Sequence, residues 1–196
     1  MARLTAYKKK RDLSETPEPP AKISHTKKSA LIFVVHKHDA TQLHYDLRLE
    51  VDGVLKSWAV PKGPSTDPSL KRLAMMVEDH PFEYRKFEGT IPKGQYGGGT
   101  VMIWDEGTYE VPEATSRREA EKLMEEGLKK GHVHVIFHGT KLHGEYALVK
   151  FHGSQNEKAW LLIKKDDEYA TTKDITKLDR SATTQRSMKE ITSEEA

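Results

Sequence analysis

One stretch of alternating residues, 44–50, constrains the fold of this 196-residue chain more than any other feature. Successive side chains of a β-strand point to opposite faces, so His44, Asp46 and Arg48 would share one face. The tyrosine and the two leucines between them would cover the other face, which can be buried. The Asp-Gly pair at positions 52 and 53 then predicts a hairpin turn into a second strand. The pattern therefore indicates an antiparallel sheet with one polar and one apolar face.

Further short apolar segments, separated by turn residues, repeat this pattern along the chain. We expect strands over residues 31–35, 44–51, 54–60, 72–77, 100–104, 108–111, 132–137, 144–152 and 159–165, with a turn at residues 105–107. One helix is predicted, because Ser116 and Glu119 form a capping box and Gly131 can end the helix. The fold class is mainly β, a small closed or nearly closed antiparallel β-barrel with one flanking helix and a flexible N-terminal arm.

The two ends of the chain differ from this middle in composition. Residues 1–29 are rich in lysine and proline, with an apolar spacing that favours neither helix nor strand, and we expect a flexible basic arm. Residues 30–180 would form the barrel domain and residues 181–196 a polar C-terminal tail. No apolar run approaches the roughly 18 residues of a membrane span, and the N-terminus lacks the apolar core of a signal peptide. The absence of cysteine excludes disulfides and fits a cytoplasmic location.

The polar face of residues 44–50 predicts a metal site. His38 lies six residues before His44, close enough to return to the same face through a bend. Two imidazoles and the carboxylate of Asp46 suit a borderline divalent cation such as Mn²⁺, Fe²⁺ or Zn²⁺, and Arg48 suits a phosphate beside it. We expect these three ligands to converge on one cation inside the barrel. The alternative is ordinary polar contact on an exposed sheet, with Asp46 bonded to His44 or Arg48.

A second segment, residues 78–84, adds further polar groups. The ordinary pKa of His80 lies near working pH, so its imidazole can donate to a phosphate oxygen or protonate a leaving alkoxide. Tyr84 can donate its phenol to the same anion, although packing beside Phe82 is an equal alternative. The glycine-rich residues 94–99 lack the Gly-Lys-Ser/Thr ending of a phosphate loop, and we interpret them as a tight barrel turn.

Taken together, these motifs resemble the 3′-phosphoesterase domain of bacterial and archaeal DNA ligase D, an end-processing module of non-homologous end joining. The resemblance runs from about residue 10 to residue 179. Several long motifs in the right order carry it: Arg11-Asp12 with Glu18-Pro19, residues 38–50, residues 58–64, residues 78–81, residues 88–99 and residues 160–165.

The resemblance implies a metal-dependent enzyme that removes a 3′-terminal ribonucleoside and then the remaining 3′-phosphate, leaving a 3′-hydroxyl for repair synthesis or ligation. It implies Mn²⁺ as the cofactor, with Zn²⁺ or Co²⁺ as alternatives. The implied roles are metal binding for His38, His44 and Asp46; phosphate binding for Arg48, His80 and Tyr84; ribonucleoside contact for Arg11, Asp12 and Glu18; and secondary contact for Lys62 and Arg72. His36 stands where the family pattern would have glutamine.

Primer–template DNA 3′ ends are the implied substrate, with an end-joining ligase, a polymerase and Ku as partners and a nucleoid-associated location. Two other functions stay open. One is a non-catalytic nucleic-acid-binding barrel that scaffolds a ligase or polymerase, and the other is a zinc-dependent phosphatase for small metabolites. The net charge of +2 is too small to identify a nucleic-acid binder by itself. Metal-dependent loss of a primer 3′-phosphate would separate these functions.

Overall fold

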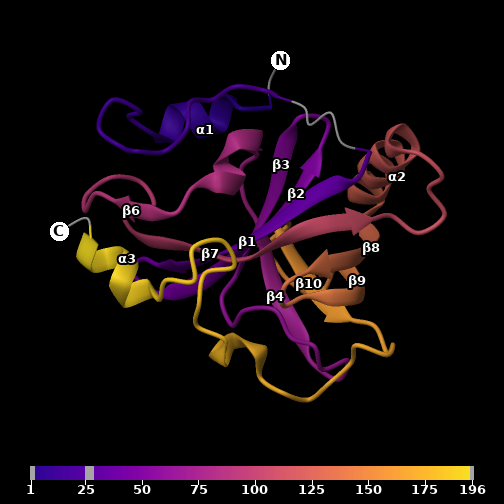
Figure 1. Cartoon of the computed structure of the whole chain (residues 1–196). Helices are drawn as coiled ribbons and strands as arrows, with labels where there is room; N and C mark the ends of the chain where they lie inside the picture. Colours follow the sequence, from indigo (N-terminus) through magenta and orange to yellow (C-terminus); the bar gives the residue numbers. More distant parts are fainter. Residues whose placement is uncertain (1–2, 25–28, 195–196) are drawn as a thin grey trace.

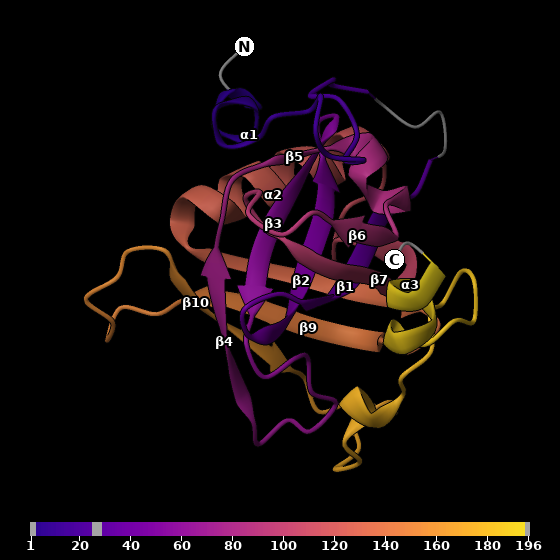
Figure 2. The ribbon, with the colours of Figure 1, turned by 90° about the vertical axis from the view of Figure 1, so that its left-hand side faces the viewer.

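The computed structural model of the chain describes residues 3–24 and 29–194. Within these ranges ten strands form one antiparallel sheet. Eight of them follow the order β1-β2-β3-β4-β10-β9-β8-β7, and β7 pairs back onto β1 to close a barrel (Figures 1 and 2). β5 pairs with β3 and β6 with β7 outside this ring. The predicted closed antiparallel barrel is confirmed.

The strands have the following bounds: β1 Leu31–Asp39, β2 Leu43–Val51, β3 Val54–Val60, β4 Lys71–Met76, β5 His80–Pro81, β6 Gly89–Ile91, β7 Gly99–Glu110, β8 His132–Gly139, β9 His143–Lys150 and β10 Ala159–Lys164. Most predicted strands recur with ends shifted by a few residues. The predicted turn at residues 105–107 is wrong, because β7 continues through it, with a shift of register against β1 next to Asp105. Asp105 instead accepts hydrogen bonds from the backbone N–H groups of Thr140, Lys141 and Leu142, so its carboxylate supports the neighbouring turn between β8 and β9.

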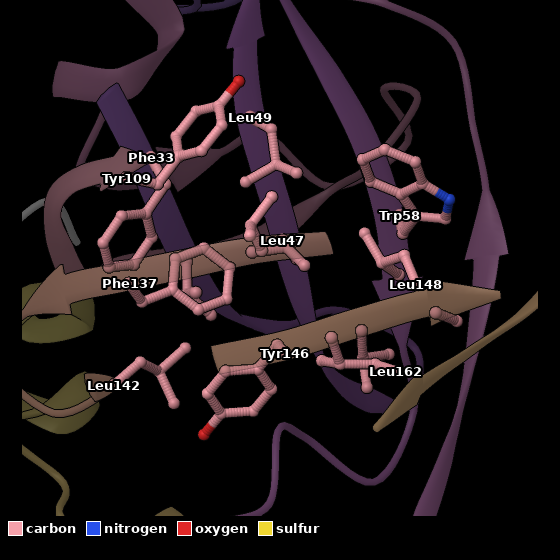
Figure 3. Close-up of a cluster of buried hydrophobic side chains, with 14 of the residues drawn as sticks. Phe33, Leu47, Leu49, Trp58, Tyr109, Phe137, Leu142, Tyr146, Leu148 and Leu162 are labelled. Atoms are coloured by element: carbon pink, nitrogen blue, oxygen red, sulfur yellow. The ribbon is translucent and has the colours of Figure 1, made fainter. Parts of the chain in front are cut away.

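Large apolar side chains fill the barrel interior (Figure 3). Phe33 of β1, Leu47 and Leu49 of β2 and Trp58 of β3 are completely buried there. The ring of Phe137 from β8 lies 4.5 Å from that of Phe33, centroid to centroid. Each such side chain contributes about 1.5–3 kcal/mol to folding relative to an exposed position. The apolar face predicted for residues 44–50 therefore points into the barrel.

A second apolar cluster covers the outer face of the same wall of the barrel. It combines side chains of the N-terminal segment, β3 and the 3₁₀ helix η1 (Phe82–Lys86) with Ile91 of β6 and Val101 of β7. Tyr7, Val54 and Leu55 are its most buried members, and Tyr84 is 2% exposed. Because this layer is apolar only in part, it leaves a polar site between itself and the barrel wall.

The structure has more helix than the one helix predicted. The described residues contain α1 (Thr5–Lys10), α2 (Arg117–Lys130), α3 (Met188–Glu194) and the 3₁₀ helix η2 (Ile175–Lys177) besides η1. The prediction of α2 is confirmed, including its caps at Ser116 and Gly131. The expectation that the arm forms no helix is wrong, because Tyr7 on α1 packs into the second cluster.

The predicted division at residues 29 and 180 stays a prediction, and residues 1–2, 25–28 and 195–196 lie outside the described parts of the chain. Among the described helices, none is long and apolar enough to cross a membrane.

Candidate metal and phosphate site

The pairing of β1 with β2 brings the predicted metal ligands together. His38 lies directly opposite His44 in the register, and His36 lies opposite Asp46. Cross-strand partners of an antiparallel pair share one face of the sheet. This face is the one opposite the core leucines, so the site lies on the outside of the barrel wall and the expectation of a cation inside the barrel is wrong. Aromatic and aliphatic side chains fill the interior.

Each histidine of this group is oriented by a backbone carbonyl. Nε2 of His38 donates to the carbonyl of Gly97 at 2.9 Å, and Nδ1 of His44 donates to the carbonyl of Gln42 at 2.9 Å. The remaining nitrogen of each ring then carries a lone pair. These two nitrogens, Nδ1 of His38 and Nε2 of His44, face different carboxylate oxygens of Asp46 at 3.6 and 3.7 Å.

The three side chains fit a divalent cation. Their ligand atoms all lie within 4.8 Å of one another, and among the residues described they form the one such group of three or more His, Asp or Glu. Bonds of about 2.1 Å place two ligand atoms of one cation roughly 3 to 3.5 Å apart, and the distances of 3.6 and 3.7 Å from the two imidazoles to Asp46 come close to this range. Contacts of 3.6 and 3.7 Å are too long for hydrogen bonds, so the arrangement suits a shared ion better than direct bonding. Mixed nitrogen and oxygen donors suit manganese, iron or zinc, and carbonyl-oriented imidazoles are typical of metal ligands.

Arg48 connects this group to the rest of the barrel wall. Its guanidinium donates to Asp46 at 3.1 Å, to Oγ of Ser57 at 3.0 Å and to Nδ1 of His36 at 3.2 Å. The ring of Tyr84 lies 4.7 Å from the guanidinium carbon. Three contacts on three different nitrogens fix the plane of the guanidinium, which has five N–H donors in all. His36 thus serves to orient Arg48.

The electrostatics keep Asp46 ionised. Its burial alone would raise the pKa of the carboxyl group. The positive charge of Arg48 and the neighbouring imidazoles of His38 and His44 outweigh this effect, and the net pKa lies well below its usual value. Asp46 is therefore a carboxylate at any working pH, as a metal ligand must be.

The N-terminal arm supplies a second arginine. Arg11, whose side chain is 4% exposed, donates to Glu18 at 2.8 Å and to Glu78 at 3.0 Å. Tyr84 donates its hydroxyl to the same oxygen of Glu18 at 2.9 Å. Burial raises the pKa of Tyr84 well above its usual value, so the phenol keeps its proton. These hydrogen bonds and ion pairs connect the arm with Tyr84 of η1 beside the site.

His80 differs from its predicted behaviour. Its Nδ1–H donates to the carbonyl of Glu78 at 2.9 Å, which leaves Nε2 to accept from Nη2 of Arg11 at 3.1 Å. Burial, then the charges of Arg48 and Arg11, lower the pKa of His80 well below its usual 6.5. The expectation of a pKa near working pH is therefore wrong for this state of the protein, in which His80 is neutral.

A cavity of about 320 Å³ opens over these groups. Its walls include His38, His44 and Asp46, which we call the metal group, together with Arg48, His80 and Tyr84. Arg11, Glu78, Tyr96 and Gly97 line it at the arm side. Cations and donors thus line one hollow with room for a phosphate and part of a sugar.

Four of the predicted residues do not line this cavity: Asp12, Glu18, Lys62 and Arg72. Asp12 is exposed and accepts hydrogen bonds from Ser14, two residues along the chain. Lys62 is exposed in the turn after β3, and Arg72 lies on β4 opposite Leu162. Neither Lys62 nor Arg72 lines the cavity. The structure therefore gathers eight of the eleven predicted site residues, Glu18 as the buried partner of Arg11.

Four further residues belong to the site that the sequence patterns did not assign to it. Glu78 pairs with Arg11, and the carbonyl of Gly97 orients His38. The ring centroid of Tyr7 lies 4.1 Å from the guanidinium carbon of Arg11, and Tyr96 lines the cavity. Gly97 and Tyr96 lie in the glycine-rich turn at residues 94–99, and the run of glycines was the available sequence signal; in the structure Gly97 adopts a positive φ of 77°.

Comparison with known proteins agrees with this geometry. A family model described as the DNA Ligase D 3′-phosphoesterase domain matches residues 36–150. The "Multifunctional non-homologous end joining protein LigD" of Pseudomonas aeruginosa is 45% identical over 87% of this chain and 19% of its own length. A protein of the same name from Mycolicibacterium smegmatis is 45% identical over 85% of this chain and 21% of its own length. The "Multifunctional non-homologous end joining DNA repair protein LigD" of Mycobacterium tuberculosis is 44% identical over 78% of this chain and 19% of its own length.

The chain thus spans about a fifth of the length of these relatives. The matched region includes the metal group, Arg48, His80 and Tyr84. On both the family match and the identity to these relatives, the chain belongs to the DNA ligase D 3′-phosphoesterase domain family.

Proposed function

We propose that this protein is a metal-dependent phosphoesterase that processes the 3′ ends of DNA primer strands. It would remove a 3′-terminal ribonucleoside and then the 3′-phosphate, leaving a 3′-hydroxyl. One observation carries the proposal. The imidazoles of His38 and His44, each oriented by a hydrogen bond to a backbone carbonyl, both face the carboxylate of Asp46 beside Arg48. Such a set of ligands and cations has no use in a protein that only binds the DNA backbone, because backbone binding requires positive charge alone.

His38, His44 and Asp46 would hold Mn²⁺, with Zn²⁺ or Co²⁺ as alternatives. When bound by these residues, the cation would supply charge neutralisation at the phosphoryl oxygens and lower the pKa of a water molecule for attack. Arg48 would bind the same phosphate through the N–H donors that its three protein contacts leave over. Its fixed plane means that no reorganisation is needed as negative charge develops.

His80 would act as the acid for the leaving oxygen once substrate is bound. Burial, and then the charges of Arg48 and Arg11, lower its pKa in the protein alone, and the negative charge of an incoming phosphate would offset the two arginines and raise it. Nε2, which accepts from Arg11 without substrate, could then carry the proton for the departing sugar oxygen. Tyr84 would keep the guanidinium of Arg48 in place with its ring and remain available as a phenol donor.

Arg11 would connect the reacting phosphate with the terminal ribonucleoside. It lines the cavity and lies between Glu18, Glu78 and His80. Recognition of a ribose requires a polar group that reaches the 2′-hydroxyl. Arg11 lines the cavity, and its buried ion-pair partner Glu18 orients the guanidinium there. In this proposal the ribose contact belongs to Arg11 and Glu18, while Asp12 supports the turn that follows Arg11.

The test uses a labelled primer that ends in 3′-phosphate, annealed to a template. We expect loss of the phosphate with Mn²⁺, no loss with chelator, and no loss with the His44→Ala variant. Binding of the primer without any metal-dependent loss would favour the scaffold function instead, and equal turnover of free nucleotides would favour a metabolite phosphatase. Under this proposal the partners are an end-joining ligase, a polymerase and Ku, and the site of action is the nucleoid.

A further inference from the structure

Tyr96 is the exposed aromatic side chain of the cavity. Its side chain is 45% exposed, whereas Tyr7 and Tyr84 of the same region are 0% and 2% exposed. An exposed ring at the mouth of a charged cavity adds nothing to the apolar core, because neither buried cluster includes it. The position therefore calls for another explanation than packing.

The turn that carries Tyr96 is held firmly from several sides. Its neighbour Gly97 receives the Nε2–H of His38 at 2.9 Å, and the side chain of Gln95 donates to Glu15 at 2.6 Å. The hydroxyl of Tyr96 itself accepts from Nζ of Lys10 at 3.0 Å. A ring held in this way loses little freedom when a ligand packs on it, which favours binding.

The contacts of Tyr96 also show on which side of the phosphate it stands. Its ring lies 5.1 Å from the guanidinium carbon of Arg11 and 4.8 Å from Nζ of Lys10. Both cations belong to the N-terminal arm. Arg11 is the residue to which the proposed function gives the ribonucleoside, so Tyr96 borders the space on the leaving-group side of the phosphate.

We propose that Tyr96 forms a stacking subsite for the base of the 3′-terminal nucleoside that the diester step releases. This inference rests on the proposed function. Every base has a π-face, and stacking on a tyrosine accepts all four with little preference. Lys10 and Arg11 beside the ring add positive charge where the strand backbone passes. The subsite serves the first step alone, because a primer that ends in 3′-phosphate has no base at this position.

The experiment compares three primers with one another in the presence of Mn²⁺: one ending in a ribonucleotide, one ending in an abasic ribose and one ending in 3′-phosphate. The variants are Tyr96→Ala, Tyr96→Phe and, as a matched control, Tyr169→Ala, whose ring is 48% exposed and does not line the cavity. Steady-state rates give kcat and KM for each pair of protein and primer.

We expect Tyr96→Ala to raise KM for the ribonucleotide primer and to lower the ratio of kcat/KM between ribonucleotide and 3′-phosphate primers roughly tenfold. Tyr96→Phe, which keeps the ring, restores the ratio, and Tyr169→Ala matches the unsubstituted protein. The abasic primer is already a poor substrate for the unsubstituted protein, and Tyr96→Ala changes its KM little.

Two results would overturn the subsite: an equal loss on ribonucleotide and 3′-phosphate primers, which indicates damage to the metal group through Gly97, or no change on any primer. Failure of the proposed function looks different. It is seen as absence of metal-dependent turnover in the unsubstituted protein, and it removes the subsite as well.

Discussion

At the scale of single residues, the chemistry of this site depends on backbone atoms as much as on side chains. The carbonyls of Gln42 and Gly97 decide which nitrogen of His44 and His38 carries the lone pair. The carbonyl of Glu78 does the same for His80. A sequence pattern names the imidazole but not its tautomer, which depends on the carbonyl that each turn presents. The residue types were therefore predictable, and the direction in which they act was not.

Arg48→Lys tests the role of the guanidinium plane. Lysine keeps the charge but cannot contact Asp46, Ser57 and His36 at once, and it lacks the fork that binds two phosphate oxygens. Loss of one charge-assisted hydrogen bond costs about 1.5–3 kcal/mol, so we expect kcat/KM on a 3′-phosphate primer to fall roughly 10- to 200-fold. Arg118→Lys, an exposed position on α2, is the matched control. Full activity of Arg48→Lys would mean that charge alone suffices.

At the scale of elements, local patterns predicted the strands well where each strand has one apolar face. They failed where a polar residue serves a neighbouring element. Asp105 looked like part of a turn, but its carboxylate is buried to bind three N–H groups of the next hairpin. α1 was missed because its few apolar residues, such as Tyr7, become buried only against residues far along the chain. Such long-range demands leave no periodic signal in a short segment.

The end of α2 offers a prediction about element stability. Gly131 adopts φ 79°, a left-handed conformation, and a side chain added there would meet Cβ of Lys150 at 2.9 Å. We expect Gly131→Ala to lower the free energy of unfolding by about 1–2 kcal/mol, measured by urea denaturation. Gly153→Ala in the loop after β9, which has no positive φ, is the comparison, and it should cost less. Equal cost in both variants would contradict the role of the helix cap.

The contacts of Glu88 with the C-terminal segment predict how the stability of the protein changes in acid. Its carboxylate accepts from the backbone N–H of Ile103 at 2.9 Å and from Arg186 at 3.0 Å. Burial raises its pKa, but the hydrogen bonds from Ser181, Thr184, Ile103 and Arg186 outweigh burial and lower it below the ordinary 4.5. The folded state thus binds the proton less readily than the unfolded state. The stability that Glu88 contributes is complete above pH 4.5 and is lost as the pH falls through the lower folded pKa.

We therefore expect Glu88→Gln to lower the free energy of unfolding at pH 7 by about 1–3 kcal/mol, with the difference from the unsubstituted protein disappearing in acid. Chemical denaturation between pH 2 and 7 measures both curves. Glu168→Gln at an exposed position should leave the curve unchanged. A constant difference at all pH values would show that the amide, rather than the lost charge, causes the effect.

At the scale of the whole molecule, the sequence indicated a sheet with two unlike faces but not which face closes inward. Closure of β7 onto β1 turns Phe33 and Leu47 into the barrel and leaves His38 and Asp46 outside. The polar face then becomes a site only because the arm, η1 and β6 cover its surroundings (Figure 2). These covering segments come from two parts of the chain, the N-terminal arm and residues 82–91, and only the closed fold brings them together over β1 and β2.

Because the metal group is assembled only by this fold, metal binding should stabilise the whole molecule. His38, His44 and Asp46 converge through strand pairing, which the unfolded chain lacks, and a cation that binds only the native state shifts unfolding by mass action. At a free Mn²⁺ concentration of about 100 Kd, we expect Tm to rise by roughly 5 to 10 °C, measured by calorimetry with and without chelator. His44→Ala should remove the shift, while His143→Ala, whose ring stacks on Tyr169 away from the site, should retain it. A shift that survives His44→Ala would place the bound cation elsewhere on the protein.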